Sequence, residues 1–342
     1  MEDRFTVLNG TIFDVSSKIK NESIHSIVTS PPYWGQRDCD NAGEIGCESC
    51  ISDYIDNLCD IFSECHKLLR SDGILWVNIN DRFIDGNLQN IPSIFSESMK
   101  KRGWFLRQYM PWVKRNAIPK GGSNKPHDSV ETIYMFTKSS SDYYYDQLSA
   151  KYEAGLVTRN FRNGDAILLE SEEDFCAFDV PTRKNFTQHF STFPIKLASI
   201  MVRSSTSDRG CETETGEPSY RILDKKRYRT RSGLKSKHDP TDRAFKDKGR
   251  HITEVSCKGW KYKNGNVIND SDKLSPSIVL DPFSGMATTG VACLNLGRKF
   301  IGVEISSEYA KQSLNRLSDH AEKYAPKDMF NIYTQEISNF QK

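Results

Sequence analysis

Two short stretches carry side chains whose types and spacing suit chemistry on a planar, amino-bearing ring. The first is TSPPYW, Thr29 to Trp34, where a hydroxyl, two prolines and two aromatic rings follow one another. The two prolines fix φ twice and so set the directions of neighbouring carbonyl groups. Such a pocket accepts the hydrogens of an amino group through Ser30 Oγ and a proline carbonyl while Tyr33 stacks on the ring. A Pro-Pro step that merely ends a strand is the alternative.

The second stretch, Ser277 to Glu304, is predicted to be a strand, a small-residue loop, a helix and a second strand ending in an acid. Small side chains let backbone amides approach a nucleotide-like ligand, and Glu304 at a strand end can accept hydrogen bonds from ribose hydroxyls. A carboxylate at Asp281 repels phosphates and suits an amine. The three-glycine dinucleotide pattern is absent. An ordinary strand-helix-strand connection, with Gly285 and Gly290 as packing residues, is the alternative.

The elements that must position these stretches alternate along the chain. Apolar residues at helical spacing predict a helix over 51–69, ended by Ser71-Asp72-Gly73. A polar loop is expected at Gly121-Gly122. Short β-leaning runs predict strands at 24–29, 74–79, 110–113, 131–137, 277–280 and 299–303. This alternation indicates an α/β fold with a mostly parallel central sheet covered by helices.

Composition and charge narrow the class of protein. The 342 residues have no apolar run of the ~18 to 20 residues that a membrane span needs, and the start, MEDRFTVLNG, does not resemble a signal peptide. Nine scattered cysteines indicate free thiols in a reducing compartment, so we expect a cytoplasmic protein with no membrane partner. The net charge is only +2, but residues 221–263 hold 15 Lys and Arg against 5 Asp and Glu. That segment is suited to an anionic partner.

With both stretches in place, the chain resembles the amino-group DNA methyltransferases that use S-adenosylmethionine, in the permuted arrangement called the β class. TSPPYW is similar to the catalytic motif, DPFSGMATTG (281–290) to the methionine-binding loop, and FIGVEIS (300–306) to the strand whose acid holds the ribose. The similarity continues through GEIGCESCISDYIDNLCDIFSECHKLLRSDGILWVNINDRF (43–83), MPWVKRNAIPK (110–120), KPHDSVETIYMFTKS (125–139) and QHFSTFPIKLASIMVRS (188–204).

The resemblance implies a Rossmann-like, circularly permuted methyltransferase fold with irregular DNA-recognition inserts. It implies S-adenosylmethionine as cofactor, with methyl transfer to the N4 amine of a flipped cytosine in duplex DNA. Serine at the first motif position favours cytosine in this family. Adenine-N6 methylation, and a nucleic-acid-binding protein with an inactive core, remain open. The implied catalytic residues are Ser30, Pro31, Pro32 and Tyr33, and the implied cofactor residues are Thr11, Phe193, Asp281, Pro282, Phe283, Ser284, Gly285, Thr288, Thr289 and Glu304.

The sequence departs from the family pattern at three places. Ala287 replaces a glycine in the methionine loop, which predicts restricted access to positive φ and weaker cofactor binding. Thr11 stands where an acid is common after Gly10. Related members often carry two Cys pairs in the later insert, but only Cys211 and Cys257 are present there, and the pair at Cys47 and Cys50 has no second pair at ligand spacing. We therefore expect no metal.

The resemblance also divides the chain. Residues 1–138 form the catalytic half, 139–186 a variable region, 187–203 a cofactor-site segment, 204–276 a basic insert and 277–342 the cofactor-binding half. Because 139–186 is partly acidic, we expect the basic insert to contact duplex DNA. The expected DNA-binding residues are Trp34, Arg227, Arg229 and Arg231. A solvated, disordered loop is the alternative for this insert. A cognate restriction endonuclease as partner, and a monomer or a homodimer, stay open.

Overall fold

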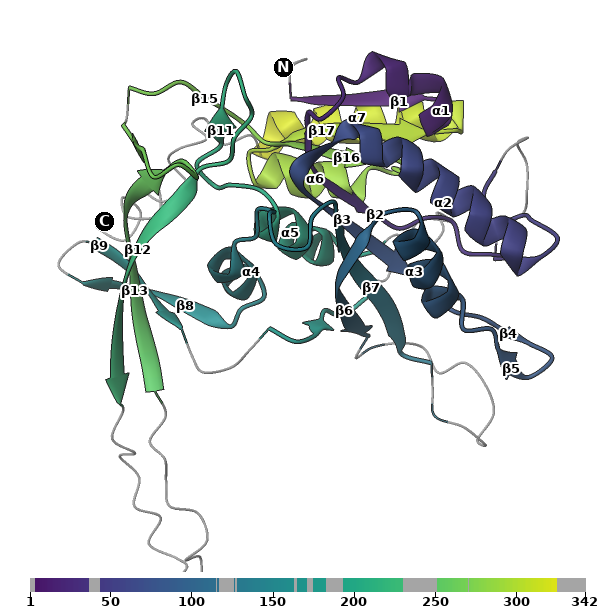
Figure 1. Ribbon diagram of the computed structural model, residues 1–342, viewed down its shortest axis with the longest axis horizontal. Coiled ribbons are helices and arrows are strands. Elements are labelled where there is room, and N and C mark those ends of the chain that lie inside the picture. The colour runs from purple at the N-terminus through teal and green to yellow at the C-terminus, as the bar shows by residue number, and fades with distance from the viewer. Residues whose placement is uncertain are drawn as a thin grey trace, which may run out of the picture.

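The central feature is an eight-stranded, mostly parallel sheet with helices on both faces (Figure 1). The computed structural model describes residues 4–36, 44–114, 116, 126, 128–162, 165–170, 175–182, 193–229, 251–269 and 271–324. Only β7 runs against its neighbours. The strand order is β1 (Phe5–Asn9), β17 (Lys299–Glu304), β16 (Ile278–Asp281), β2 (Ile24–Thr29), β3 (Leu69–Ile79), β7 (Val130–Thr137), β6 (Phe105–Val113) and β10 (Phe178–Asp179).

Two apolar clusters cover the two faces of this sheet. One face packs against α1 (Ile12–Val15), α2 (Ile51–Leu68) and α3 (Ile91–Lys101), and the short helix η1 (Ser16–Lys18) follows α1. The other face packs against α5 (Ile195–Ser204), α6 (Thr288–Asn295) and α7 (Ser307–Tyr324). A sheet buried on both sides explains why its inner strands read as continuous apolar runs. The α/β class predicted from the sequence is confirmed.

The two inserts join in one second sheet, which lies to one side of the core beyond α4 (Gln147–Glu153) and α5 (Figure 1). From the first insert come β8 (Val157–Arg162) and β9 (Asp165–Glu170), and from the second come β12 (Tyr220–Arg229), β13 (His251–Lys261) and β14 (Val267–Ile268). β9 pairs with β13 antiparallel. We call these five strands the insert sheet. The sequence analysis treats the two inserts as separate candidates for DNA contact, whereas in the structure they form one sheet.

The described charged residues of the second insert form strands. β12 and β13 pair antiparallel over Tyr220–Arg229 and His251–Lys261, with a register shift between Ile222 and Leu223. The acidity of the first insert is partly neutralised, because Glu170 pairs with Lys151 of α4 at 2.9 Å and with Lys225 of β12 at 3.7 Å. The smaller pairs are β4 (Phe83–Ile84) with β5 (Asn87–Leu88), and β11 (Cys211–Glu212) with β15 (Leu274–Ser275).

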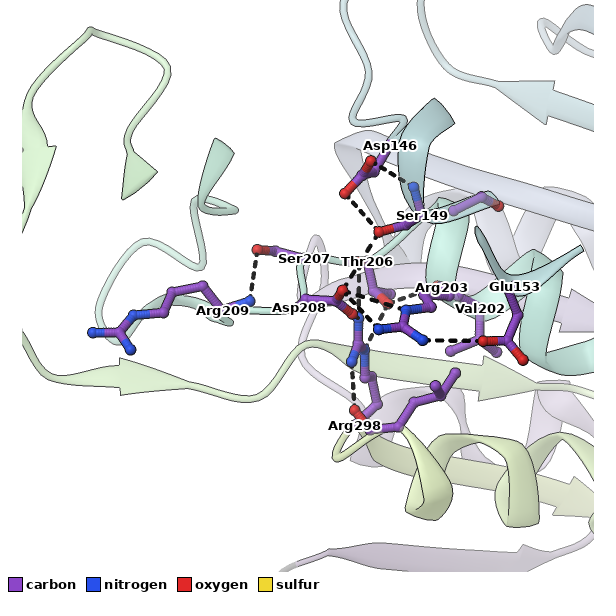
Figure 2. Close-up of polar contacts among 12 residues, drawn as sticks. Asp146, Ser149, Glu153, Val202, Arg203, Thr206, Ser207, Asp208, Arg209 and Arg298 are labelled. Carbon is purple, nitrogen blue, oxygen red and sulfur yellow. Dashed lines mark hydrogen bonds and ion pairs between the residues drawn. The ribbon is translucent and has the colours of Figure 1, made fainter. Parts of the chain in front are cut away.

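A buried cluster of charges joins the insert sheet to the core through Arg221 of β12. Figure 2 shows Asp208, Arg203, Arg298 and Glu153 of this cluster. Asp208 is 5% exposed and receives Arg203 from α5 at 3.1 Å and Arg298, which precedes β17, at 2.7 Å. Arg221 of β12 also pairs with Asp208. Two further acids complete what we call the Asp208 cluster: Asp146 pairs with Arg221 and Glu153 pairs with Arg203, both at 3.0 Å. Three arginines thus face three carboxylates, and the cations hold the pKa of Asp208 far below its usual value despite burial.

Two predicted details are wrong. Strand β3 begins at Leu69, so Ser71-Asp72-Gly73 lies inside a strand and does not form a turn. Cys47 is disulfide-bonded, which contradicts free thiols at that position, whereas the remaining described cysteines are free. Among the described residues, no three His, Cys, Asp or Glu side chains are grouped so that they could hold one metal ion. None of the helices in the described part of the chain has the length and apolar character of a membrane span.

Candidate active site

The candidate site lies along one edge of the central sheet, where the parallel strands β1, β17, β16, β2 and β3 end. Strand β7 runs in the opposite direction, so its first residues reach the same edge. We call this the carboxyl edge. Ligands of open α/β sheets bind at such an edge because the connecting loops and side chains from several strands converge there. Both stretches singled out in the sequence, Thr29 to Trp34 and Asp281 to Glu304, meet at it.

Asp281 connects these two stretches directly. Its Oδ1 accepts hydrogen bonds from Thr29 Oγ1 at 2.6 Å and from the Phe283 amide at 3.1 Å, and its Oδ2 accepts from Thr289 Oγ1 at 2.8 Å. The side chain is 2% exposed, and burial raises the pKa of Asp281 to about 6 against these hydrogen bonds. The carboxylate thus fixes the start of the loop between β16 and α6. Direct contact with an amine ligand stays a prediction.

Glu304 ends β17 and is held by the backbone on both sides. Its Oε2 accepts from the Gly285 amide at 2.8 Å and its Oε1 from the Ser306 amide at 2.9 Å. These bonds bring the carboxylate next to the loop that follows β16. Hydrogen bonding of Glu304 to ribose hydroxyls stays a prediction.

The loop itself contains buried polar atoms that suit a polar ligand. Within the described chain, Ser284 Oγ and Thr288 Oγ1 are buried and lack a hydrogen-bond partner. Apart from the two chain neighbours of Gly285, no described residue has an atom within 4 Å of the position that a Cβ there would occupy. Ala287 takes φ of 55° and ψ of 45°, the left-handed conformation of the glycine it replaces. The restricted access to positive φ is therefore expressed as roughly 1 to 2 kcal/mol of strain, which the loop accepts. Weaker cofactor binding stays a prediction.

Two other predicted cofactor residues have different surroundings. Thr11 caps α1, and its hydroxyl donates to Asp14 Oδ2 at 2.6 Å. The Thr11 hydroxyl is therefore engaged with Asp14, an acid three residues later that the sequence reasoning missed. Contact of Thr11 with the cofactor stays a prediction. Hydrogen bonds from the Thr11 side chain and amide lower the pKa of Asp14. Phe193 is 8% exposed and belongs to the apolar cluster that includes Leu197 and Trp112. Pro282 and Phe283 lie within the loop that Asp281 fixes.

Tyr33 is held at the carboxyl edge by polar side chains from separate strands. Its hydroxyl donates to Glu131 Oε2 at 2.7 Å and accepts from Asn78 Nδ2 at 3.0 Å and from Ser30 Oγ at 3.2 Å. Asn78 Nδ2 also donates to Glu131 Oε2 at 2.7 Å, and Lys114 pairs with Glu131 Oε1. We call these five residues the Tyr33 network. Burial first, and then the charge of Glu131, raise the pKa of Tyr33 well above its usual value.

The prolines and Trp34 are fixed by neighbouring side chains. Pro31 is buried, and the Pro32 carbonyl accepts from Tyr54 Oη at 3.0 Å. Trp34 donates its indole N–H to the Glu48 carbonyl at 2.8 Å, and the Arg82 guanidinium lies 5.2 Å from the centre of its ring. The structure thus presents Ser30 and Tyr33 in a rigid loop.

Asn78, Glu131 and Lys114 were not identified from the sequence. A signal was present in two of them, because Asn78 interrupts the apolar run 74–79 and Glu131 opens an otherwise apolar strand. The predicted DNA-contacting residues come from different parts of the chain. Arg227 and Arg229 lie on β12, far along the chain from Trp34. Arg231 lies outside the described residues.

Comparison with known proteins identifies the class. Residues 24–211 and 225–315 match the family model of the N6/N4 DNA methylases. The chain therefore belongs to the family of DNA methyltransferases that modify cytosine N4 or adenine N6. Members of this family use S-adenosylmethionine, and the partner-free hydroxyls of Ser284 and Thr288 beside the Glu304 carboxylate fit its polar groups.

The proteins similar to this chain include one named for adenine and one named for cytosine N4. The chain is 38% identical over 326 residues to the type II methyltransferase M2.LlaDCHI of Lactococcus lactis subsp. cremoris, a match that covers 90% of this chain and 87% of the relative. It is 25% identical to the DNA adenine methyltransferase YhdJ of Escherichia coli (strain K12), covering 98% and 90%. The solved PvuII DNA methyltransferase, described as cytosine-N4-specific, shares the fold with a TM-score of 0.57, 16% identity and coverage of 94% and 93%.

Proposed function

We propose that this DNA methyltransferase transfers a methyl group to N4 of a cytosine flipped out of duplex DNA at a specific site. The observation that carries the proposal is Ser30, a neutral hydroxyl at the first position of the catalytic motif, held against Tyr33 at the carboxyl edge. The similarity in fold to a cytosine-N4-specific enzyme supports it. The relative that methylates adenine makes adenine N6 the second candidate.

The chemistry places two demands on the residues at the edge. An exocyclic amine is a poor nucleophile because its lone pair is delocalised into the ring. Acceptors at Ser30 Oγ and the Pro31 carbonyl would take the two amino hydrogens, which favours a tetrahedral nitrogen and directs its lone pair outward. The ring of Tyr33 would stack on the extruded base. When bound, S-adenosylmethionine supplies an electrophilic methyl group on its sulfonium, held by the Ser284, Thr288 and Glu304 side of the edge.

The test of base identity is a digest of methylated DNA. The protein is incubated with labelled S-adenosylmethionine and duplex DNA, and the nucleosides are separated by mass spectrometry. We expect N4-methylcytosine. A digest containing only N6-methyladenine would assign the chain to the second candidate, and a digest without label would favour a binding protein with an inactive core.

We also propose that the insert sheet contacts the DNA backbone. Lys225 and Lys226 on β12 have side chains 53% and 61% exposed, and Arg227 follows them. Exposed cations on a strand displace counterions from phosphates and supply affinity that does not depend on sequence. The two inserts pair through β9 and β13, so the variable region of 139–186 would be carried to the DNA by the same sheet.

Neutralising Arg227, Arg229 and Arg231 tests this surface. The triple glutamine variant should bind DNA more weakly, with a salt slope shallower by up to about 3, because each lost phosphate contact removes about 0.9. Cofactor affinity should be unchanged. A control of equal charge change, Lys67→Gln with Lys100→Gln and Lys101→Gln on α2 and α3, should keep the wild-type slope. An unchanged slope in the arginine variant would remove the insert sheet from the binding surface.

A further inference from the structure

The Tyr33 network has a direction, because each hydrogen bond in it has one assigned donor. Glu131 is paired with the Lys114 ammonium and its side chain is 6% exposed, so its carboxylate oxygens only accept. Tyr33 has a single hydroxyl hydrogen, which it donates in the 2.7 Å hydrogen bond to the charged Glu131 carboxylate. Toward its other neighbours the Tyr33 oxygen can therefore only accept.

Asn78 reinforces this direction. It lies on β3 and is 1% exposed, and both of its amide contacts run from Nδ2, one to Tyr33 Oη and one to Glu131 Oε2. Its Oδ1 is buried and makes no hydrogen bond to any described residue. A reversed amide would place Oδ1 against the Glu131 carboxylate, so the charge of Glu131 fixes the amide orientation at the expense of one unsatisfied acceptor.

The direction reaches Ser30. Because the Tyr33 hydroxyl donates its hydrogen bond to Glu131, the Ser30 hydroxyl donates to the Tyr33 oxygen and keeps its own lone pairs for other partners. The Ser30–Tyr33 distance of 3.2 Å is the longest in the network, and such contacts in ligand-free enzymes tighten when substrate binds. A Ser30 proton turned the other way would point at the amine and occupy the lone pair that must attack.

We propose that Glu131 is a positioning residue which, through the hydroxyl of Tyr33, sets Ser30 as a hydrogen-bond acceptor for the amino group of the target base. This inference rests on the proposed function, in which Ser30 receives an amino hydrogen. It gives Tyr33 two separable parts: the ring stacks on the base, and the hydroxyl transmits the charge of Glu131. Tyr33 remains protonated at neutral pH, since burial raises its pKa, so the relay persists there.

The experiment measures single-turnover methylation at saturating cofactor and DNA for Tyr33→Phe, Glu131→Gln and Ser30→Ala, singly and in pairs. Loss of one hydrogen bond in a directed network predicts a rate about tenfold lower for Tyr33→Phe and for Glu131→Gln. The cofactor dissociation constant should be unchanged. Tyr33→Phe keeps the ring, so the fluorescence of 2-aminopurine at the target position should report the same base extrusion as the wild type.

Coupling separates positioning from a general structural effect. In the Ser30→Ala background, Tyr33→Phe and Glu131→Gln should cause no further loss of rate, because the group they orient is gone. Losses that multiply with that of Ser30→Ala would overturn the relay. Glu153→Gln also removes a carboxylate from an arginine and a lysine, the buried Arg203 and the half-exposed Lys196, but lies on α4. It is the matched control and should keep the wild-type rate.

The remaining outcomes distinguish the relay from the proposed function. A slow Ser30→Ala with a wild-type Tyr33→Phe overturns the relay and leaves the proposed role of Ser30 standing. A wild-type rate in Ser30→Ala overturns both. If Glu131→Gln fails to fold because Lys114 loses its partner, the pair Glu131→Gln with Lys114→Met removes both charges, and Tyr33→Phe tests the relay independently.

Discussion

The Asp208 cluster and the Tyr33 network are both buried and charged, but they differ in composition. Around Asp208 three arginines meet three carboxylates, and Figure 2 shows Asp208 with Arg203, Arg298 and Glu153. Arg221 of β12 joins the cluster through Asp146 and Asp208. Around Tyr33 one Lys–Glu pair acts on two neutral hydroxyls and one amide, and Asn78 Oδ1 has no hydrogen-bond partner in the described part of the chain. Opposite charges that satisfy one another hold a fold together, whereas a pair surrounded by neutral groups orients their dipoles. Buried charge alone therefore does not mark an active site.

The largest effect that would test this comparison is on stability. Asp208→Ala removes the carboxylate that Arg203, Arg221 and Arg298 share. Breaking a buried ion pair of this kind lowers the free energy of unfolding by about 3 to 5 kcal/mol. Urea unfolding should show this loss, with the insert sheet affected first because Arg221 belongs to β12. Turnover per folded molecule should be kept. A stable Asp208→Ala variant with slow methyl transfer would place the cluster in the chemistry and contradict the comparison.

Asp281 shares features with both groups of buried charges. It lies at the carboxyl edge, as the Tyr33 network does, but its carboxylate accepts hydrogen bonds from Thr29, Phe283 and Thr289. Its folded pKa of about 6 exceeds the unfolded value of about 4, so folding favours the protonated form. The stability that this proton supplies is complete below pH 4 and is lost as the pH rises through 6. We therefore expect wild-type stability to fall by about 3 kcal/mol relative to Asp281→Asn across that window.

Urea unfolding at several pH values measures this difference. Asp319→Asn on the surface of α7 is the control for the change in charge. A difference between wild type and Asp281→Asn that stays constant from pH 4 to pH 6 would contradict the assigned direction.

Glu304 should affect ligand binding more than folding. Glu304→Ala removes a charged acceptor from the end of β17, which should weaken S-adenosylmethionine binding by about 1.5 to 3 kcal/mol. Isothermal titration calorimetry gives this value directly. Glu153→Ala, a carboxylate of the Asp208 cluster, should leave the affinity unchanged. Equal affinity in Glu304→Ala and the wild type would remove Glu304 from the cofactor site.

The smallest effect is expected at Ala287. Glycine would relieve about 1 to 2 kcal/mol of left-handed strain but would lose about 0.8 kcal/mol of methyl burial and about 0.5 to 1 kcal/mol to added chain freedom. The unfolding free energy of Ala287→Gly should thus differ from wild type by less than about 1 kcal/mol. Calorimetric titration measures the cofactor affinity of Ala287→Gly. If Ala287 weakens cofactor binding in the wild type, the affinity of this variant should be higher. A loss of several kcal/mol would mean that the methyl group is required for packing.

Local sequence patterns predicted the carboxyl edge well. Strand β2 was predicted at its observed limits, 24–29, because a buried apolar run stops at two prolines. The unit from β16 to β17 followed from its apolar strands, small-residue loop and Gly297. Gly73 was misread, because a Cβ there would approach Leu69 and the His25 carbonyl, so the glycine serves close packing within β3.

The insert sheet and the Tyr33 network were beyond local patterns for a common reason. β9 and β13 pair across more than 80 residues, and neither sequence alternates apolar with polar residues in a way that indicates a strand. Likewise Glu131 reads as an exposed acid until β7 is placed antiparallel beside β3, which carries it to Asn78. Contacts between segments distant along the chain decide both, and residue type alone does not encode them.

The pairing of β1 only with β17 within the described sheet has a consequence for synthesis of the chain. β16 and β17 separate β1 from β2, yet they follow both by more than 240 residues. During translation one side of β2 therefore waits as an open strand edge until the last part of the sheet leaves the ribosome. Such a high contact order predicts slow folding and exposure to aggregation on the way. The permuted order of the strands is therefore expected to slow folding without affecting the folded enzyme.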